Sequence, residues 1–132
     1  MKFPDDFLFG VGSSAYQIEG AANEGGKGQS TLDKFLHEKP DAVIDGSNGD
    51  TACNSYHLYK KDAAIMNDLG VNFYRFSINW CRILPTGDIT KINQEGINHY
   101  NDVINNLIEN GIQPMVTMFH WDLPQALQDM GG

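Results

Sequence analysis

Two kinds of hydrophobic pattern alternate along the chain. Three short runs rich in aromatic and β-branched residues, at residues 7–9, 71–78 and 114–120, predict β-strands. Between them, apolar residues recur every three or four positions from Thr51 to Leu69 and again from Gln94 to Glu109. That spacing places the apolar side chains on one face of a helix, so it predicts two amphipathic helices.

Capping and turn-forming residues set the expected ends of these helices. Gly70 and Gly111 are typical of the left-handed position that follows a helix, and Asp50 or Thr51 is suited to cap the start of the first one. Each helix is followed within a few residues by a strand. The order strand, long loop, helix, strand, helix, strand indicates an α/β fold with parallel strands joined by right-handed crossovers.

The segment from 20 to 49 is rich in glycine and proline, which break any regular period. We expect a long loop there, with room for one helical turn at 31–37. Residues 16–28 carry several glycines and no helical periodicity, so no helix is expected directly after the first strand. A third helix is expected to begin near Pro124.

The charge balance excludes several classes of partner. Because 17 acidic residues stand against 9 Lys and Arg, the formal charge is −8, and the clustered cations that bind nucleic acid are missing. No apolar run approaches the ~18 residues of a membrane span, so no membrane partner is expected. The start lacks an apolar signal segment. A cytoplasmic location is therefore expected, or an extracellular one if a leader precedes Met1; the oligomeric state stays open.

Length and cysteine content narrow the fold further. The 132 residues suit one modest domain, whereas a complete α/β barrel needs roughly 200–250 residues. Cys53 and Cys81 are too few for a disulfide scaffold and wrongly spaced for zinc, so we expect no metal and a reduced Cys81 thiol.

A glycine-rich turn after the first strand raises the possibility of a nucleotide cofactor. Residues 10–15, Gly-Val-Gly-Ser-Ser-Ala, fit the dinucleotide pattern G-x-G-x-x-A. That site needs a helix N-terminus to hold the pyrophosphate, and the sequence predicts no such helix. A generic cofactor-binding α/β domain is therefore disfavoured, and no cofactor is expected.

Polar residues at the ends of the predicted strands are the better candidates for a site. His120 and Trp121 follow the third strand, and ligands of parallel sheets bind at that end. A histidine beside an indole suits a sugar, although a packed Trp with a hydrogen-bonded His is equally consistent. Arg75 is the only charge within the second strand, and it indicates either an anionic partner or a structural ion pair.

One segment carries a clear resemblance. Residues 7–21, Phe-Leu-Phe-Gly-Val-Gly-Ser-Ser-Ala-Tyr-Gln-Ile-Glu-Gly-Ala, resemble the N-terminal signature of glycoside hydrolase family 1, the β-glucosidase and myrosinase family. The resemblance continues over the whole chain and is closest in style to insect members. Further matching segments lie at 48–52, 56–60, 74–80, 82–85 and 120–125.

The resemblance implies the first three βα units of a (β/α)8 TIM barrel, with residues 1–132 forming an incomplete barrel domain. It implies a retaining β-glycosidase whose partner is a β-glycoside. On this basis Gln17, His120 and Trp121 would bind the non-reducing sugar. Arg75 would orient the nucleophilic carboxylate and lower its pKa.

The resemblance also implies what the segment lacks. Retaining glycosidases use two carboxylates ~5–5.5 Å apart, and the family carries them in Thr-x-Asn-Glu-Pro and Thr-Glu-Asn-Gly motifs after strands four and seven. Neither motif occurs in the sequence, so no catalytic residue is expected here. Glu24 and Glu109 mimic parts of these motifs in the wrong places. Four further residues of the matching segments are expected to be structural: Glu19, His57, Trp80 and Asp122.

Two functions are therefore compared. In the first, these residues belong to a β-glucosidase-like hydrolase that hydrolyses O-glycosidic bonds. In the second, they form a truncated, inactive relative with at most weak sugar binding.

Overall fold

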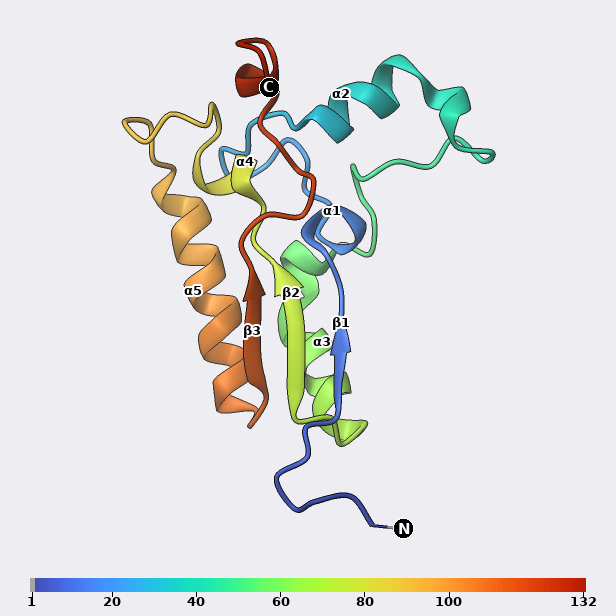
Figure 1. Ribbon diagram of the computed structural model, residues 1–132, viewed down its shortest axis with the longest axis vertical. Helices are drawn as coiled ribbons and strands as arrows, with labels where there is room; N and C mark the ends of the chain where they lie inside the picture. Colours follow the sequence, from blue (N-terminus) through green and yellow to red (C-terminus); the bar gives the residue numbers. More distant parts are fainter. Residues whose placement is uncertain (1) are drawn as a thin grey trace.

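The computed structural model describes residues 2–132 and contains a three-stranded parallel sheet. Its strands are β1 (Gly10–Gly12), β2 (Phe73–Ser77) and β3 (Gln113–Thr117), in that order across the sheet. Gly12 lies beside Arg75, and Arg75 lies beside Met115. The parallel order predicted from the sequence is confirmed, and Figure 1 shows the three strands running the same way.

Helices connect the strands and surround their carboxyl ends. The short helices α1, α2, α4 and α6 gather at that end, and the N-terminus lies at the other (Figure 1). The helices, with one 3-10 turn η1, are α1 (Ala15–Ile18), α2 (Thr31–Glu38), η1 (Pro40–Ala42), α3 (Ser55–Asp68), α4 (Trp80–Ile83), α5 (Gln94–Glu109) and α6 (Gln125–Gln128). None of the helices in residues 2–132 combines the length and the apolar character needed to traverse a bilayer.

The first strand lies three residues later than predicted. Its glycines allow the backbone to approach β2 closely: a Cβ atom on Gly10 would overlap the ring and carbonyl oxygen of Phe73. The aromatic residues before it instead cluster with one another, with the Phe7 and Phe9 ring centroids 4.8 Å apart. Aromatic enrichment therefore indicated the neighbourhood of the strand but not the paired residues.

The two long helices were predicted closely at their C-terminal ends. Helix α5 has the predicted bounds, and α3 is followed by Gly70 in the left-handed conformation. The predicted cap of α3 was wrong, because the helix begins at Ser55 after Asn54, whose φ is +56°. Residues 51–53 form a turn, and the Asn54 N–H donates to the Thr51 carbonyl at 2.8 Å.

Two helical segments differ from the expectation for the long loop. Helix α2 has two turns rather than one, and Ser30 caps it by accepting a hydrogen bond from the Asp33 N–H. Helix α1 forms one turn where none was predicted. Its first N–H, on Ala15, donates to the Ser77 hydroxyl at 2.7 Å, so a tertiary contact supports a turn that has no sequence periodicity.

Helices α3 and α5 cover one face of the sheet. The core between them and β2 comprises Ala63, Met66, Phe76, Tyr100, Leu107 and Ile112. Leu69, which directly follows α3, and Ile108, the second-last residue of α5, are 69% and 58% exposed, so the apolar patterns extend beyond the residues that the core buries. Burial of the core side chains is the main favourable contribution to this packing, at about 1.5–3 kcal/mol for each large one.

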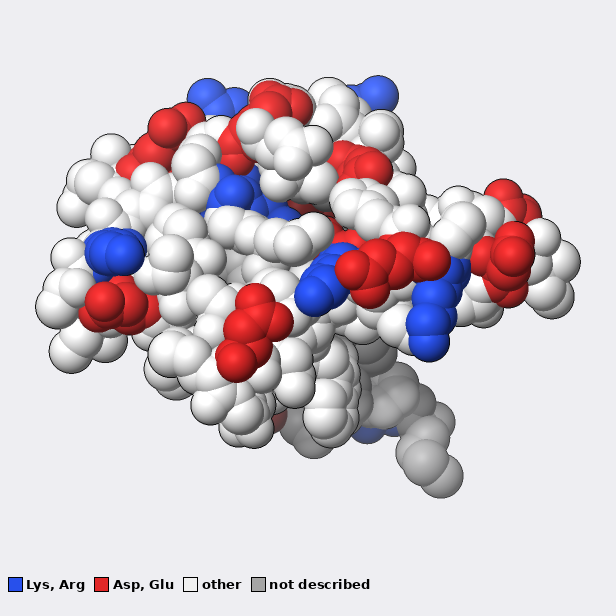
Figure 2. Space-filling model, turned by 90° about the horizontal axis from the view of Figure 1, so that it is seen from above, with Lys and Arg blue, Asp and Glu red and all other residues white. Residues whose placement is uncertain are grey.

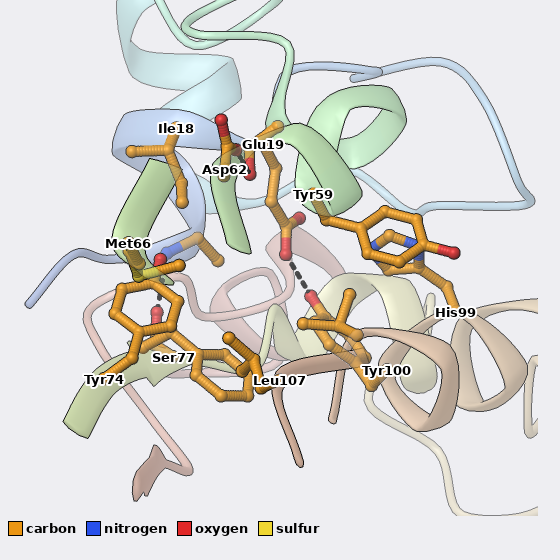
Figure 3. A pocket seen from close by; sticks show the side chains of 14 residues that line it. Ile18, Glu19, Tyr59, Asp62, Met66, Tyr74, Ser77, His99, Tyr100 and Leu107 are labelled. Carbon is orange, nitrogen blue, oxygen red and sulfur yellow. Dashed lines mark hydrogen bonds between the residues drawn. The ribbon is translucent and has the colours of Figure 1, made fainter. Parts of the chain in front are cut away.

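A polar network closes the top of this core. Figure 3 shows Glu19 pointing down from the end of α1 toward Tyr100 of α5, whose hydroxyl donates to the Glu19 carboxylate at 2.5 Å. Arg82 of α4, which is fully buried, donates to the same carboxylate at 3.2 Å and to the carbonyl groups of Gly20 and Glu24. Glu19 therefore ties the first loop down, as predicted.

Candidate functional site

Arg75 lies on the sheet face opposite α3 and α5. Its neighbours along the strand, Tyr74 and Phe76, point toward the helices and pack in or against the core. Successive side chains of a strand alternate between faces, so Arg75 points the other way. It is half-buried, and its Nη1 atom donates to the Ser13 carbonyl at 3.3 Å. Within residues 2–132 Arg75 has no carboxylate partner, so the structural ion pair weighed above is not present there.

His120 and Trp121 lie in the loop that follows β3, next to Arg75. The His120 Nδ1 atom is 3.5 Å from the Arg75 Nη1 atom. Trp121 is 74% exposed and has a φ of +69°, which is rare for a bulky residue. A shallow hollow at this point is lined by Arg75, Met115, Thr117, Phe119, His120 and Trp121.

Gln17 lies on α1, which follows β1 at the same end of the sheet (Figure 1). Gln17 is exposed, and its side chain makes no hydrogen bond to another residue of the described chain. The structure therefore brings Arg75, His120 and Trp121 together around one hollow. Gln17 lies at the same carboxyl end of the sheet but does not line that hollow.

Asp122 holds the loop that carries His120 and Trp121. It is 1% exposed, and its two carboxylate oxygens accept from different loops. One accepts from the His120 N–H at 3.2 Å and the other from the Trp80 N–H at 3.0 Å. The structural role predicted for Asp122 agrees with these contacts, whereas the link from Asp122 to His120 was not foreseen; the Trp80 contact is made by the backbone and does not test the role predicted for its side chain.

A second anchor ties the far end of that loop to the long first loop. The Thr31 N–H donates to the Leu123 carbonyl, and the Gln125 N–H donates to the Gln29 carbonyl, both at 2.9 Å. A buried ion pair between Lys27 and Asp33 lies next to this junction, and the Asp33 carboxylate also accepts from the Ser30 N–H. Sequence reasoning missed the pair; the Ser30-x-x-Asp33 spacing could have signalled the start of α2 but not Lys27.

The glutamates rejected as catalytic lie away from the hollow. Glu24 accepts from the exposed His57 at 2.9 Å in the first loop, and Glu109 ends α5 at the amino end of β3. No group of three His, Cys, Asp or Glu side chains in residues 2–132 is arranged to hold a metal ion. Acidic and basic side chains are interspersed over the end of the molecule seen in Figure 2.

Burial changes the acid–base behaviour of several groups around this end. It raises the pKa of Glu19 despite the opposing effect of Arg82, and it raises the pKa of the Cys81 thiol to about 12. It also lowers the pKa of His99, which stacks on Tyr56, to about 4. None of the three groups lines the hollow, and Glu19 and His99 line a separate pocket between the sheet and the helices α3 and α5.

Comparison with known proteins decides the family. The sequence profile described as Glycosyl hydrolase family 1 matches residues 1–132. The chain belongs to glycosyl hydrolase family 1. Among curated family 1 relatives, Myrosinase 1 of Brevicoryne brassicae is 56% identical over 131 residues, covering 99% of this chain and 28% of that protein. Ipecac alkaloid beta-glucosidase 9 of Carapichea ipecacuanha is 62% identical over 128 residues, covering 96% and 24%.

Solved structures of family 1 members confirm the fold class. Aphid myrosinase superposes with a TM-score of 0.97 at 55% identity, covering all of this chain and 29% of that one. A family 1 β-glucosidase from Thermotoga maritima gives 0.94 at 50% identity, covering 99% and 29%. The chain spans about a quarter of the length of the relatives it matches, and it corresponds to the first three βα units of their TIM barrel.

Proposed function

We propose that residues 1–132 supply the sugar-binding quarter of a retaining β-glycosidase acting on β-glucosides. The observation that carries the proposal is the meeting of Arg75 and His120 around one hollow at the carboxyl end of the sheet. Ligands of α/β barrels bind at that end. The relatives are named as β-glucosidases and a myrosinase, which supports a β-glucosidic substrate.

The side chains suit a sugar. The His120 imidazole and the Gln17 amide can donate to and accept from hydroxyl groups, and the exposed Trp121 indole offers an apolar surface. A site that hydrogen-bonds the hydroxyls of its sugar discriminates against an analogue that lacks one of them, because the protein group is then left unpaired in the complex. Gln17 is assigned on the signature alone, because the hollow does not include it.

Arg75 suits a different task. In a complete family 1 barrel the nucleophilic carboxylate would come from outside these residues, since neither motif for a catalytic carboxylate occurs in them. A guanidinium facing that carboxylate would favour its ionised form and so lower its pKa. Arg75 has no competing acid within the described chain, so its charge is available for that partner.

The alternative is an inactive relative that binds sugar weakly. A chimera tests whether these residues support catalysis once a family member supplies the two carboxylate motifs. Residues 1–132 replace the matching part of the Thermotoga maritima β-glucosidase, and hydrolysis of a chromogenic β-glucoside is measured beside the 132-residue chain. We expect turnover by the chimera and none by the chain alone, because loss of groups that act as a unit typically costs ~10⁴–10⁶ in rate.

Variants of the chimera test the residues. Gln17→Ala and His120→Ala should each lower kcat/KM by roughly 5- to 150-fold, the equivalent of about 1–3 kcal/mol for an unpaired polar group. His57→Ala is the matched control, because that histidine is exposed and pairs with Glu24 away from the hollow. A folded chimera without turnover, or one in which His120→Ala equals wild type, would contradict the proposal.

A further inference from the structure

We propose that Asp122 is a positioning residue that sets the direction of the His120 imidazole in the sugar site. The inference rests on the proposed function, and it adds a residue that the motif assigns no task. Asp122 does not line the hollow, so it would act on the sugar only through its neighbour.

The contacts of Asp122 connect two loops through one buried carboxylate. One oxygen accepts from the His120 N–H, in the loop after β3, and the other from the Trp80 N–H, in the turn after β2. The Asp122 carbonyl also accepts from the buried Cys81 thiol at 3.4 Å. These contacts fix the position of the loop after β3 relative to the end of β2, the strand that carries Arg75.

The backbone around Asp122 is held in an unfavourable conformation. Trp121 stands between the two hydrogen-bonded residues with a φ of +69°. Non-glycine residues adopt such angles only where the surrounding structure determines them, and those places cluster at functional sites. The hydrogen bond from His120 back to Asp122 closes this turn, so its loss would allow Trp121 to return to an extended backbone.

The rest of the loop has its own anchors. The backbone bonds of Leu123 to Thr31 and of Gln125 to Gln29 hold the segment beyond Asp122. Loss of the Asp122 contacts would therefore free residues 119–121 and leave the segment from 123 onward in place. The effect should concentrate on His120, whose ring now lies 3.5 Å from Arg75.

An amide in place of the carboxylate isolates this effect. Asn has the same shape as Asp, but of its two terminal side-chain atoms only the oxygen can accept a hydrogen bond, because the nitrogen is a donor. In Asp122→Asn one of the two N–H donors would face an NH₂ group. We expect a loss in kcat/KM of about 10-fold or more, because small displacements of a binding group cost far more than their size suggests.

A double-mutant cycle separates positioning from general stability. Asp122→Asn is measured in the chimera with His120 present and in the His120→Ala background, beside the melting temperature of each. If Asp122 acts through His120, its loss in kcat/KM shrinks to less than about twofold once His120 is gone. Ser77→Ala is the matched control, since Ser77 is a buried side chain that holds the other loop through Ala15, and its effect should be equal in both backgrounds.

The outcomes are distinct. An equal loss in both backgrounds, or no loss at all, would overturn the inference while leaving the proposed function intact. A wild-type chimera without turnover would contradict the proposed function and the inference together. If Asp122→Asn does not fold, Asp122→Glu, which keeps both acceptor oxygens on a longer side chain, replaces it in the same cycle with the same expected coupling.

Discussion

The two faces of the sheet differ in how closely their side chains are packed and how exposed they are. Toward α3 and α5, side chains such as Phe76 and Leu107 are closely packed, and Leu107 is 2% exposed. On the opposite face, Arg75 is half-buried, and Met115 beside it is 52% exposed. The face covered by α3 and α5 contributes most to the stability of these residues, whereas the opposite face presents polar groups at the ends of its strands.

The difference separates stability from function along a single strand. Phe76 and Arg75 are neighbours in β2, yet one fills the core and the other borders the hollow. Alternation of strand side chains makes this division possible. We therefore expect substitutions on the helix-covered face to change the free energy of unfolding and those on the open face to change kcat/KM, with little crossover.

The largest expected effect is on the covered face. Leu107→Ala in the chimera should reduce the free energy of unfolding by about 2–5 kcal/mol, because it leaves a cavity in the core. Ile108→Ala, one residue further along α5 and 58% exposed, is the control and should change it by less than about 0.5 kcal/mol. Urea denaturation measures both. Equal effects would contradict the assignment of the faces.

The next effect is on the open face. Arg75→Met should lower kcat/KM by roughly 100-fold, equivalent to about 2.7 kcal/mol, through loss of the charge that faces the nucleophile. Removal of the cation raises the pKa of the carboxylate, so the acidic limb of the pH–rate profile should move to higher pH. Arg75→Lys keeps the charge without the planar fork and should fall in between. An unshifted acidic limb would exclude this role.

A pH effect should arise behind the sheet, at His99. Burial and the charge of Arg82 lower its pKa from the usual 6.5 to about 4, while Asp102 opposes them. The unfolded chain therefore binds a proton between about pH 6.5 and 4 that the folded chain does not, and stability falls as the pH is lowered through that range. His99→Gln should flatten the dependence of the urea midpoint between pH 7 and 5. An unchanged slope would count against a buried neutral imidazole.

The smallest expected effect concerns the reactivity of the two cysteine thiols. Cys53 is exposed, whereas Cys81 is buried and its pKa is raised to about 12, which leaves it protonated and unreactive. Alkylation of the native chimera should label the peptide that contains Cys53 and spare the one that contains Cys81. Labelling of both before denaturation would show that the loop around Asp122 is open.

The sequence predicted the elements that are determined by local, periodic patterns of residues. Apolar periodicity located α5 at its observed ends, and Gly70 marked the end of α3, because these signals are local. It missed α1 and the true start of β1, where a contact to Ser77 and a close approach to Phe73 decide the structure. Both contacts join residues about sixty positions apart, and no local pattern encodes them.

The candidate site divides in the same way. Arg75, His120 and Trp121 stood out from their strand positions and from the family signature. Arg82 and the Lys27–Asp33 pair did not, although both are buried and hold the loops in place. A buried cation is visible only once its partners are assembled around it, since in sequence it is identical to a solvated one.

One paired measurement tests the division between the faces most directly. His120→Ala and Leu107→Ala are compared in the chimera, each by its melting temperature and by kcat/KM well below that temperature. The account predicts that His120→Ala lowers kcat/KM and leaves the melting temperature nearly unchanged, while Leu107→Ala does the reverse. It is contradicted if both variants lower both quantities together, or if His120→Ala lowers only the melting temperature.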